Sequence, residues 1–270
     1  MTLLSRRALV SSRQRMDGTS VLMLFAAGLA GGVVTAIVGG ASLITFPAML
    51  AAGLPAIIAN ASNTVAMSPG NLIAAVADLE RRPRWDRSFV GLALICIGGS
   101  IGGALLLLAT PAAAFTAVVP ALIGFATILF ALSGRIRQWI VARRTRAAAS
   151  HERLSLLLFV PVAVYGGYFG AGMSVMLLAL LSVSRGDDFR TANVLKNLLS
   201  GLTGLVAVVV FIERGVVDWP PTLAMMAGAL AGGFLGGRLV RVLPPRLVRW
   251  IVIGVGSVLT VIYAWRYWLR

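Results

Sequence analysis

Two clusters of polar side chains interrupt otherwise apolar stretches of this sequence. The later cluster contains Lys196, the only lysine in the chain, together with Asn193 and Asn197. An ionisable side chain inside an apolar helix is costly and by default suggests a functional site. There the ammonium group would offer positive charge to an anion, whereas a lysine that snorkels to the nearby headgroups is the alternative.

The earlier cluster would supply neutral hydrogen-bond donors to the same kind of ligand. Hydrogen bonding between helices and capping of a helix start are the alternative roles for such side chains. The members of this cluster are Asn60, Ser62, Asn63 and Thr64.

Glycines precede each polar cluster and interrupt the apolar run that leads to it. Gly39 and Gly40 lie before the first cluster, and Gly170 and Gly172 lie before the second. Broken backbone at membrane depth is tolerated mainly where it is buried in protein or lines a cavity. A helix that restarts after such a break directs its N-terminal amides and the positive end of its dipole at an anion. A kink or close helix packing is the simpler interpretation.

The composition is that of an integral membrane protein. Hydrophobic residues make up 59% of the 270-residue chain, charged residues only 12%, and the mean hydropathy is +0.91. A soluble domain carries about 25% charged residues. Several uncharged runs have about 20 residues, the length that crosses a hydrocarbon core. We therefore expect an all-α bundle with about eight transmembrane segments, multi-pass in the bacterial inner (plasma) membrane.

The net charge of +15 comes from arginines in short segments between the apolar runs. This distribution follows the positive-inside rule, so it predicts contact with the lipid bilayer and not with nucleic acid. The basic N-terminus and the Arg-rich segment 134–153 are both expected on the cytoplasmic side. The segment 238–249 is also basic, and placing it on that side conflicts with a count of eight crossings.

The order of features repeats with a lag of 132–133 residues. Gly39 aligns with Gly172, Asn60 with Asn193, and Asn63 with Lys196. Two such halves commonly meet at a substrate site near the bilayer midplane. The sequence leaves open whether the repeats are inverted or parallel. The predicted organisation is a basic cytoplasmic tail (1–19), a first membrane repeat (20–133), an Arg-rich cytoplasmic loop (134–153) and a second membrane repeat (154–270).

The motifs around both breaks resemble those of the TauE/SafE sulfite-exporter family of permeases. In the first half they read Gly39-Gly40-Ala41-Ser42-Leu43-Ile44-Thr45-Phe46-Pro47, Gly53-Leu54-Pro55 and Ala59-Asn60-Ala61-Ser62-Asn63. In the second half they read Gly166-Gly167-Tyr168-Phe169-Gly170-Ala171-Gly172, Arg190-Thr191-Ala192, Lys196 and Val217-Asp218-Trp219. The resemblance covers nearly the whole chain after residue 20. It implies transport of small organic or inorganic anions, frequently sulfur-containing ones.

We therefore expect a transporter of a small anion such as sulfite, a sulfonate or thiosulfate, and not an enzyme. No CxxC, HExxH or Walker-type motif suggests a cofactor or a metal. Two alternatives remain open: a structural or assembly-partner membrane protein without solute flux, and an intramembrane hydrolase that pairs Lys196 with Ser42 or Ser62. A homo-oligomer is compatible with each of these functions.

Overall fold

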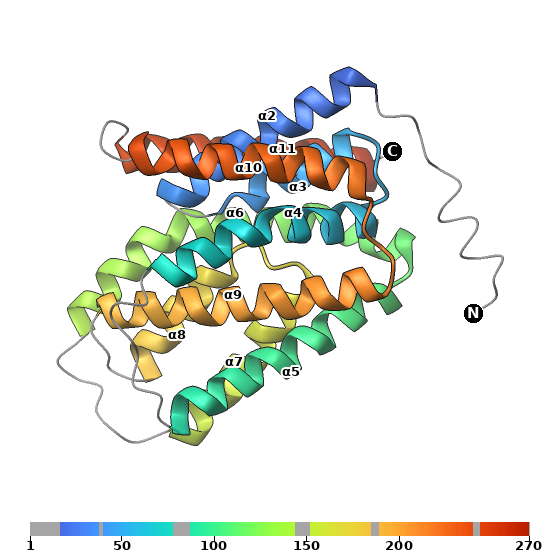
Figure 1. Cartoon of the computed structure of the whole chain (residues 1–270). Coiled ribbons are helices and arrows are strands. Elements are labelled where there is room, and N and C mark those ends of the chain that lie inside the picture. Colours follow the sequence, from blue (N-terminus) through green and yellow to red (C-terminus); the bar gives the residue numbers. More distant parts are fainter. Residues whose placement is uncertain are drawn as a thin grey trace.

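The computed structural model describes residues 17–37, 40–77, 87–143, 152–184, 189–239 and 244–269, and over these residues the chain is helical without strands (Figure 1). This confirms the predicted all-α membrane fold. The helices are α2 (Gly18–Ile37), α3 (Ser42–Ala51), α4 (Ala56–Ala77), α5 (Arg87–Ala109), α6 (Ala112–Arg143), α7 (Glu152–Tyr168), α8 (Met173–Ser184), α9 (Phe189–Glu213), α10 (Trp219–Leu239) and α11 (Pro245–Trp268).

Among the described residues, five helices are long and apolar enough to cross a membrane. They are α2, α5, and the main parts of α6, α9 and α11. Three shorter apolar helices occur in α3, α7 and α8. The short helices follow from the glycine breaks, which end one helix and start the next before a full crossing is complete.

The ten helices form two sets of five in the same order. The starts of α4 and α9, residues 56 and 189, are 133 residues apart, and those of α5 and α10, residues 87 and 219, are 132 apart. The breaks after α2 and α7 fall at equivalent positions. The lag that the sequence predicts is therefore also the spacing of the helices.

Each set of five packs its first helix against the fourth helix of the other set. A Cβ atom at Gly28 of α2 would lie 2.1 Å from the Met225 carbonyl oxygen of α10, and one at Gly103 of α5 would lie 2.0 Å from the Val164 carbonyl oxygen of α7. Only glycine permits such an approach, as in small-residue interfaces of membrane helices. In each pair, later residues of one helix contact later residues of the other. Helix α2 therefore runs parallel to α10, and α7 runs parallel to α5.

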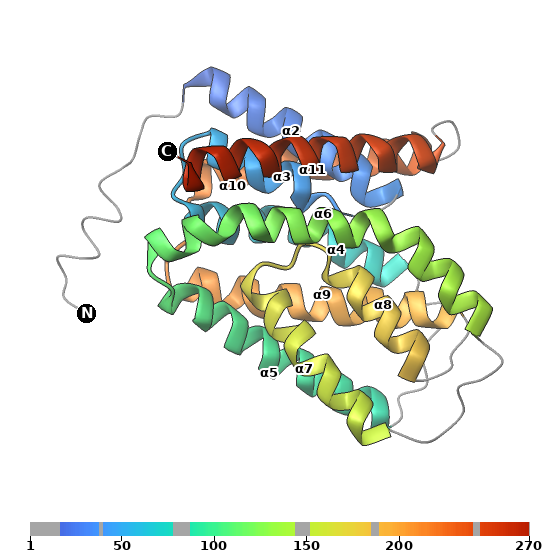
Figure 2. The same cartoon turned by 180° about the vertical axis from the view of Figure 1, so that it is seen from behind.

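Equivalent helices of the two sets run antiparallel. Gly124 of α6 lies against Thr260 of α11, and Gly134 lies against Arg249. Trp268 Nε1 donates a hydrogen bond of 2.7 Å to the Ala117 carbonyl at the other end of this pair. The two halves are therefore inverted relative to each other, which answers the question that the sequence leaves open. Figures 1 and 2 show α6 and α11, and α4 and α9, running in opposite directions.

The bundle has two distinct ends. At the terminal end, α2 and α10 begin and α11 stops; at the arginine end, α6 stops and α7 and α11 begin (Figure 1). The start of α2 and the end of α6 at Arg143 thus lie at opposite ends of the bundle, whereas the basic N-terminus and the segment 134–153 are expected on the same side. The end of α6 shares its end of the bundle with the starts of α7 and α11, and the described part of each half contains five helices.

The central segment itself differs from the expected loop. Helix α6 continues to Arg143 and α7 begins at Glu152, while residues 144–151 lie outside the described part of the chain. The N-terminal tail is outside it as well up to residue 16.

Candidate functional site

Glycine residues set both helix breaks by adopting the left-handed backbone conformation. Gly40, just before α3, and Gly172, just before α8, have the same φ of +84°, and Gly170 has +76°. Side-chain-bearing residues rarely adopt this conformation. The Gly40 carbonyl accepts a hydrogen bond from the Leu43 amide (3.1 Å), and the Gly172 carbonyl accepts one from the Val175 amide (3.0 Å). The two breaks therefore have the same local geometry. Gly39 lies outside the described residues.

The two breaks meet at the middle of α6. A Cβ atom at Gly40 would lie 2.8 Å from the ring of Phe130, and one at Gly172 would lie 3.3 Å from the side chain of Leu129. Figure 2 shows the connection between α7 and α8 reaching the centre of α6. The starts of α3 and α8, one from each half, consequently lie at one turn of the same helix.

An aromatic contact also joins the broken elements. The ring of Phe46 in α3 packs edge-on against Phe169 in the second break, with 5.3 Å between ring centroids. Phe169 in turn contacts Tyr165, whose ring packs against Phe125 of α6. The breaks are therefore packed within protein, as irregular backbone in a membrane requires.

The geometry of α3 and α8 favours a negative charge near this meeting point. Both helices start there and run toward opposite ends of the bundle (Figure 2). The first amides of a helix have no acceptor within the helix, and the positive end of the helix dipole lies at the same place. Two helix N-termini that approach one point from opposite directions favour the binding of an oxyanion there.

Asn60 of α4 stabilises the second break. Its side chain is 1% exposed, and its Nδ2 donates a hydrogen bond of 3.0 Å to the carbonyl of Tyr168, the last residue of α7. The Tyr165 hydroxyl donates one of 2.7 Å to the Ala171 carbonyl. These bonds satisfy carbonyls at the point where the helix is interrupted.

Two other members of the first cluster use their side chains in hydrogen bonds, and only that of Ser62 joins α4 to another segment. Ser62 is fully buried and accepts a hydrogen bond of 3.0 Å from the Asp218 amide in the connection before α10. Thr64 donates one of 2.8 Å to the Asn60 carbonyl within α4.

Asn63 differs from its neighbours in the cluster. Its side chain is 2% exposed, and its buried Oδ1 has no hydrogen-bond partner in the described structure. Leaving a buried polar atom unpaired costs about 1–3 kcal/mol, and each such atom in a native structure needs an explanation. Within the first cluster, Asn63 is therefore the residue with the capacity to bind something further.

The second cluster is arranged around its lysine. Lys196 Nζ donates a hydrogen bond of 3.0 Å to Asn193 Oδ1 one turn earlier in α9. Lys196, Asn193 and Asn197 are each half-buried. The half-buried Lys196 side chain therefore has a polar partner for its ammonium group, as a charge within a membrane requires.

The structure does not bring the two clusters together. Helices α4 and α9 cross where a Cβ atom at Gly204 would lie 3.9 Å from Ser68 Oγ. Asn63 precedes Ser68 by five residues and Lys196 precedes Gly204 by eight. Because the helices are antiparallel, these positions lie on opposite sides of the crossing, about 20 Å apart along the helix axes. The two clusters are therefore separated along the helices, and Asn60 of the first cluster lies at the second break.

The sequence did not point to α6. Its central residues Ala126, Leu129 and Phe130 contact the two breaks, yet their run has only isolated Gly124 and Thr127 among apolar residues and is typical of an ordinary span. The aromatic partners Phe46 and Phe169 do sit inside the break motifs, but their pairing depends on how two segments 123 residues apart in sequence fold together.

The fold and this site define a class of protein. An apolar helical bundle made of two inverted halves, with interrupted helices that meet at its centre, is an architecture of multi-pass membrane transporters. The sequence model of the family described as "Sulfite exporter TauE/SafE" matches residues 24–263. The chain belongs to this family of membrane transporters.

Similar proteins carry matching names. A "Probable membrane transporter protein" of Haemophilus influenzae is 27% identical over 88% of this chain and 92% of its own length. "Probable membrane transporter protein YfcA" of Escherichia coli K12 is 26% identical over 88% of this chain and 87% of its own. A third, "ORF9" of a Sinorhizobium species, is 25% identical over 88% and 90%. No solved structure matches the chain.

Proposed function

We propose that this protein moves a small sulfur-containing anion, such as sulfite, thiosulfate or a sulfonate, across the bacterial inner membrane. The observation that carries the proposal is the convergence of two half-helix N-termini, from α3 and α8, on one turn of α6. Amides and helix dipoles of this kind bind anions. The description of the family supplies the sulfur chemistry.

The proposed roles follow the geometry. The glycines at the described breaks, Gly40, Gly170 and Gly172, let α3 and α8 start near the oxyanion, so that the positive ends of both helix dipoles face it. Gly39, which lies outside the described residues, is expected to act with them. Asn63 contacts the solute from α4. Lys196 supplies positive charge from α9, and Asn193 and Asn197 contribute polar side chains beside it. Asn60, Ser62 and Thr64 position α4 and the second break through the hydrogen bonds described above.

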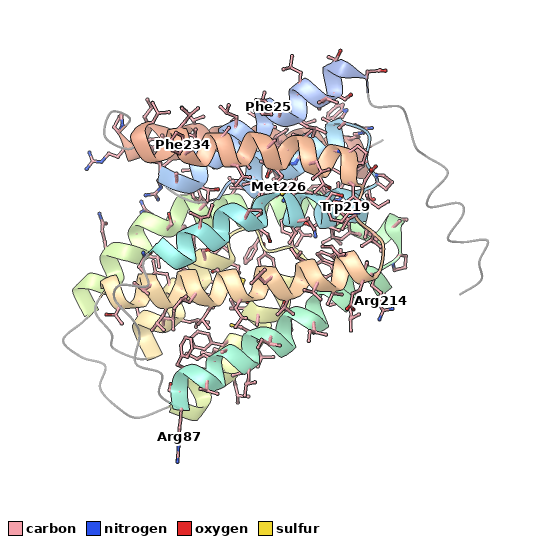
Figure 3. The ribbon with its side chains drawn as sticks, in the orientation of Figure 1. Phe25, Arg87, Arg214, Trp219, Met226 and Phe234 are labelled. Carbon is pink, nitrogen blue, oxygen red and sulfur yellow. The ribbon has the colours of Figure 1, made fainter. Side chains whose placement is uncertain are left out.

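We further propose that the arginine end faces the cytoplasm. Of the 23 arginines in the chain, 16 fall in the segments 78–87, 134–153, 185–190 and 238–249, which join or flank helix ends at the arginine end. Figure 3 shows Arg87 at this end and Arg214 at the other. By the positive-inside rule this places the start of α2 on the periplasmic side, with the two membrane repeats inverted across the bilayer.

The geometry gives no support to an intramembrane hydrolase that pairs Lys196 with Ser62. A serine nucleophile must lie within hydrogen-bond reach of its base. Ser62 Oγ is engaged by the Asp218 amide and lies across the α4–α9 crossing from Lys196.

Flux measurements in proteoliposomes test the proposal directly. We expect uptake or efflux with at least one of sulfite, thiosulfate, sulfonates and carboxylates. Gly172→Ala should lower this flux strongly, because alanine is strained at a φ of +84° and its Cβ would press on Leu129. Gly98→Ala is the matched control, since a Cβ atom there meets nothing within 4 Å. Absence of flux with every anion, beside a working control carrier, would refute the proposal.

A further inference from the structure

Helices α6 and α11, the last helices of the two halves, form an antiparallel pair on one face of the bundle (Figure 2). Near the middle of the pair the helices are close, since a Cβ atom at Gly124 would lie 3.1 Å from the side chain of Thr260. They separate toward the arginine end, where the long side chain of Arg249 reaches across to α6. The arginine end of this pair therefore depends on a charged side chain.

The guanidinium group of Arg249 is held in a fixed place between the two helices. Its Nη2 donates a hydrogen bond to the Ala131 carbonyl of α6, and a Cβ atom at Gly134 would overlap its Nη1. The absence of a side chain at Gly134 thus makes room for this group. A guanidinium carries five N–H donors in a planar fork, so the bond to Ala131 leaves several of them for a further acceptor.

A different donor joins the two helices at the other end of the pair. There Trp268 Nε1 of α11 donates a hydrogen bond of 2.7 Å to the Ala117 carbonyl of α6. An indole has a single N–H donor, so this contact uses all the hydrogen-bonding capacity of the side chain. A neutral group is therefore sufficient to bridge α6 and α11, and the guanidinium of Arg249 brings charge and additional donors to the arginine end.

Two more arginines lie on one side of the pair beside Arg249. Arg135 follows Gly134 in α6, and Arg246 lies about one turn before Arg249 in α11. With about 100° per residue, Arg135 is rotated by about 100° from Gly134 and Arg246 by about 60° from Arg249. Because the helices are antiparallel, both rotations turn the side chains toward the same side of the pair. Both side chains are exposed.

The two segments that meet here contain only positive charge. Residues 134–151 include five arginines and residues 238–249 include four, and neither segment contains an aspartate or a glutamate. The first turn of α11 adds the positive end of its helix dipole. Like charges at short range repel each other, so an anion among these groups would stabilise the arrangement.

An exposed apolar surface continues from the arginines along α11. Trp250, next to Arg249, is 69% exposed, and tryptophan is enriched where a membrane meets water. Leu247, Ile251 and Val258 lie on one face of the helix and are 50%, 53% and 58% exposed. A cluster that suits an anionic group thus lies directly beside a surface that suits lipid chains.

We infer that the arginine end of the α6–α11 pair binds the phosphate group of an anionic phospholipid. Arg135, Arg246 and Arg249 donate hydrogen bonds to the phosphate oxygens, whose geometry matches the guanidinium fork. The acyl chains lie along the exposed apolar face of α11. Basic sites between membrane helices recognise anionic headgroups by the same chemistry. The lipid joins the two halves where α6 and α11 separate, and this site does not depend on the proposed anion transport.

Thermal unfolding in detergent tests this inference on the purified, delipidated protein. The protein is titrated with phosphatidylglycerol, with phosphatidylcholine of the same chain length, and with inorganic phosphate. Phosphatidylglycerol should raise the unfolding midpoint in a saturable manner, because a ligand that binds the folded state stabilises it. Phosphatidylcholine lacks the net negative charge and inorganic phosphate lacks the chains, so neither should have this effect at the same concentration.

Charge-removing variants locate the site. Arg135→Gln combined with Arg246→Gln should weaken the apparent affinity for phosphatidylglycerol about 25-fold, at about fivefold for each arginine. Both side chains are exposed, so the variant is expected to fold. Arg214→Gln combined with Arg266→Gln removes two exposed arginines near the terminal end and is the matched control, which should leave the affinity unchanged.

Native mass spectrometry of the same samples gives a second measurement that does not depend on stability. The unchanged protein and the control should retain bound phosphatidylglycerol, and the variant of Arg135 and Arg246 should lose it. Equal retention by this variant and the control, or equal stabilisation by phosphatidylglycerol and phosphatidylcholine, would overturn the lipid site. Equal stabilisation by inorganic phosphate would also overturn it, because the cluster would then bind a free anion.

Discussion

The first turns of α4 and α9 occupy equivalent places in the two halves, yet their side chains make different contacts. In α4, Asn60 reaches across to the end of α7, and Asn63 has a buried oxygen without a partner. In α9, the equivalent Asn193 is engaged by Lys196 of its own helix. The backbones of α4 and α9 are thus equivalent in the two halves. One aligned position differs, with Asn63 in α4 and Lys196 in α9, so the positive charge lies in one half only.

This difference assigns separate tasks to the two helices. A neutral amide in α4 and an ammonium in α9, on opposite sides of the helix crossing, would receive a solute at different stages of its passage.

The largest effect is expected from removing the charge that distinguishes α9. Lys196→Gln should lower anion flux about 10- to 100-fold, since hydrogen bonds to charged groups are worth about 1.5–3 kcal/mol. Arg214→Gln, at an exposed arginine near the terminal end, is the matched control and should leave flux unchanged. Equal effects of the two variants in proteoliposome assays would mean that the comparison of α4 with α9 has no functional meaning.

A smaller effect is expected when the two equivalent asparagines are truncated. Asn60→Ala leaves the Tyr168 carbonyl unpaired in a buried setting, so it should destabilise the protein by about 1–3 kcal/mol. Asn193→Ala removes an acceptor at a half-buried position and should cost less. Thermal unfolding in detergent at matched conditions measures both, and a larger loss for Asn193→Ala would contradict the difference between the two asparagines.

The smallest change in stability, and the sharpest separation of stability from function, is expected at Asn63. Asn63→Leu replaces an amide with an unpaired oxygen by an apolar group of similar size, so thermal stability should stay the same or rise. Anion flux should nevertheless fall, because the contact with the solute is lost. A stable variant with full flux would remove Asn63 from the site and leave α9 as the only polar cluster in contact with the anion.

Sequence reasoning identified most residues of the candidate site but not the contacts between them. Gly40 and Gly172 could be identified because glycine within an apolar run is a local signal, and Lys196 because a single charge there stands out. The partner of Asn60 could not, since the Tyr168 carbonyl lies 108 residues away and carries no side-chain signature. The count of about eight segments did not reveal that α3 and α8 are separate short helices, so the sequence could not show that α2 starts and α6 ends at opposite ends of the bundle.

By itself the sequence determined that this is a membrane bundle of two repeats with glycine-broken helices, because hydropathy, glycine conformation and charge act over a few neighbouring residues. Only the tertiary structure decided that the repeats are inverted, that both breaks meet on α6, and that the polar clusters lie on opposite sides of a helix crossing. Those features depend on which helices, far apart in the sequence, pack against each other. Glycine-lined helices from different halves approach closely, and no single segment determines that packing by itself.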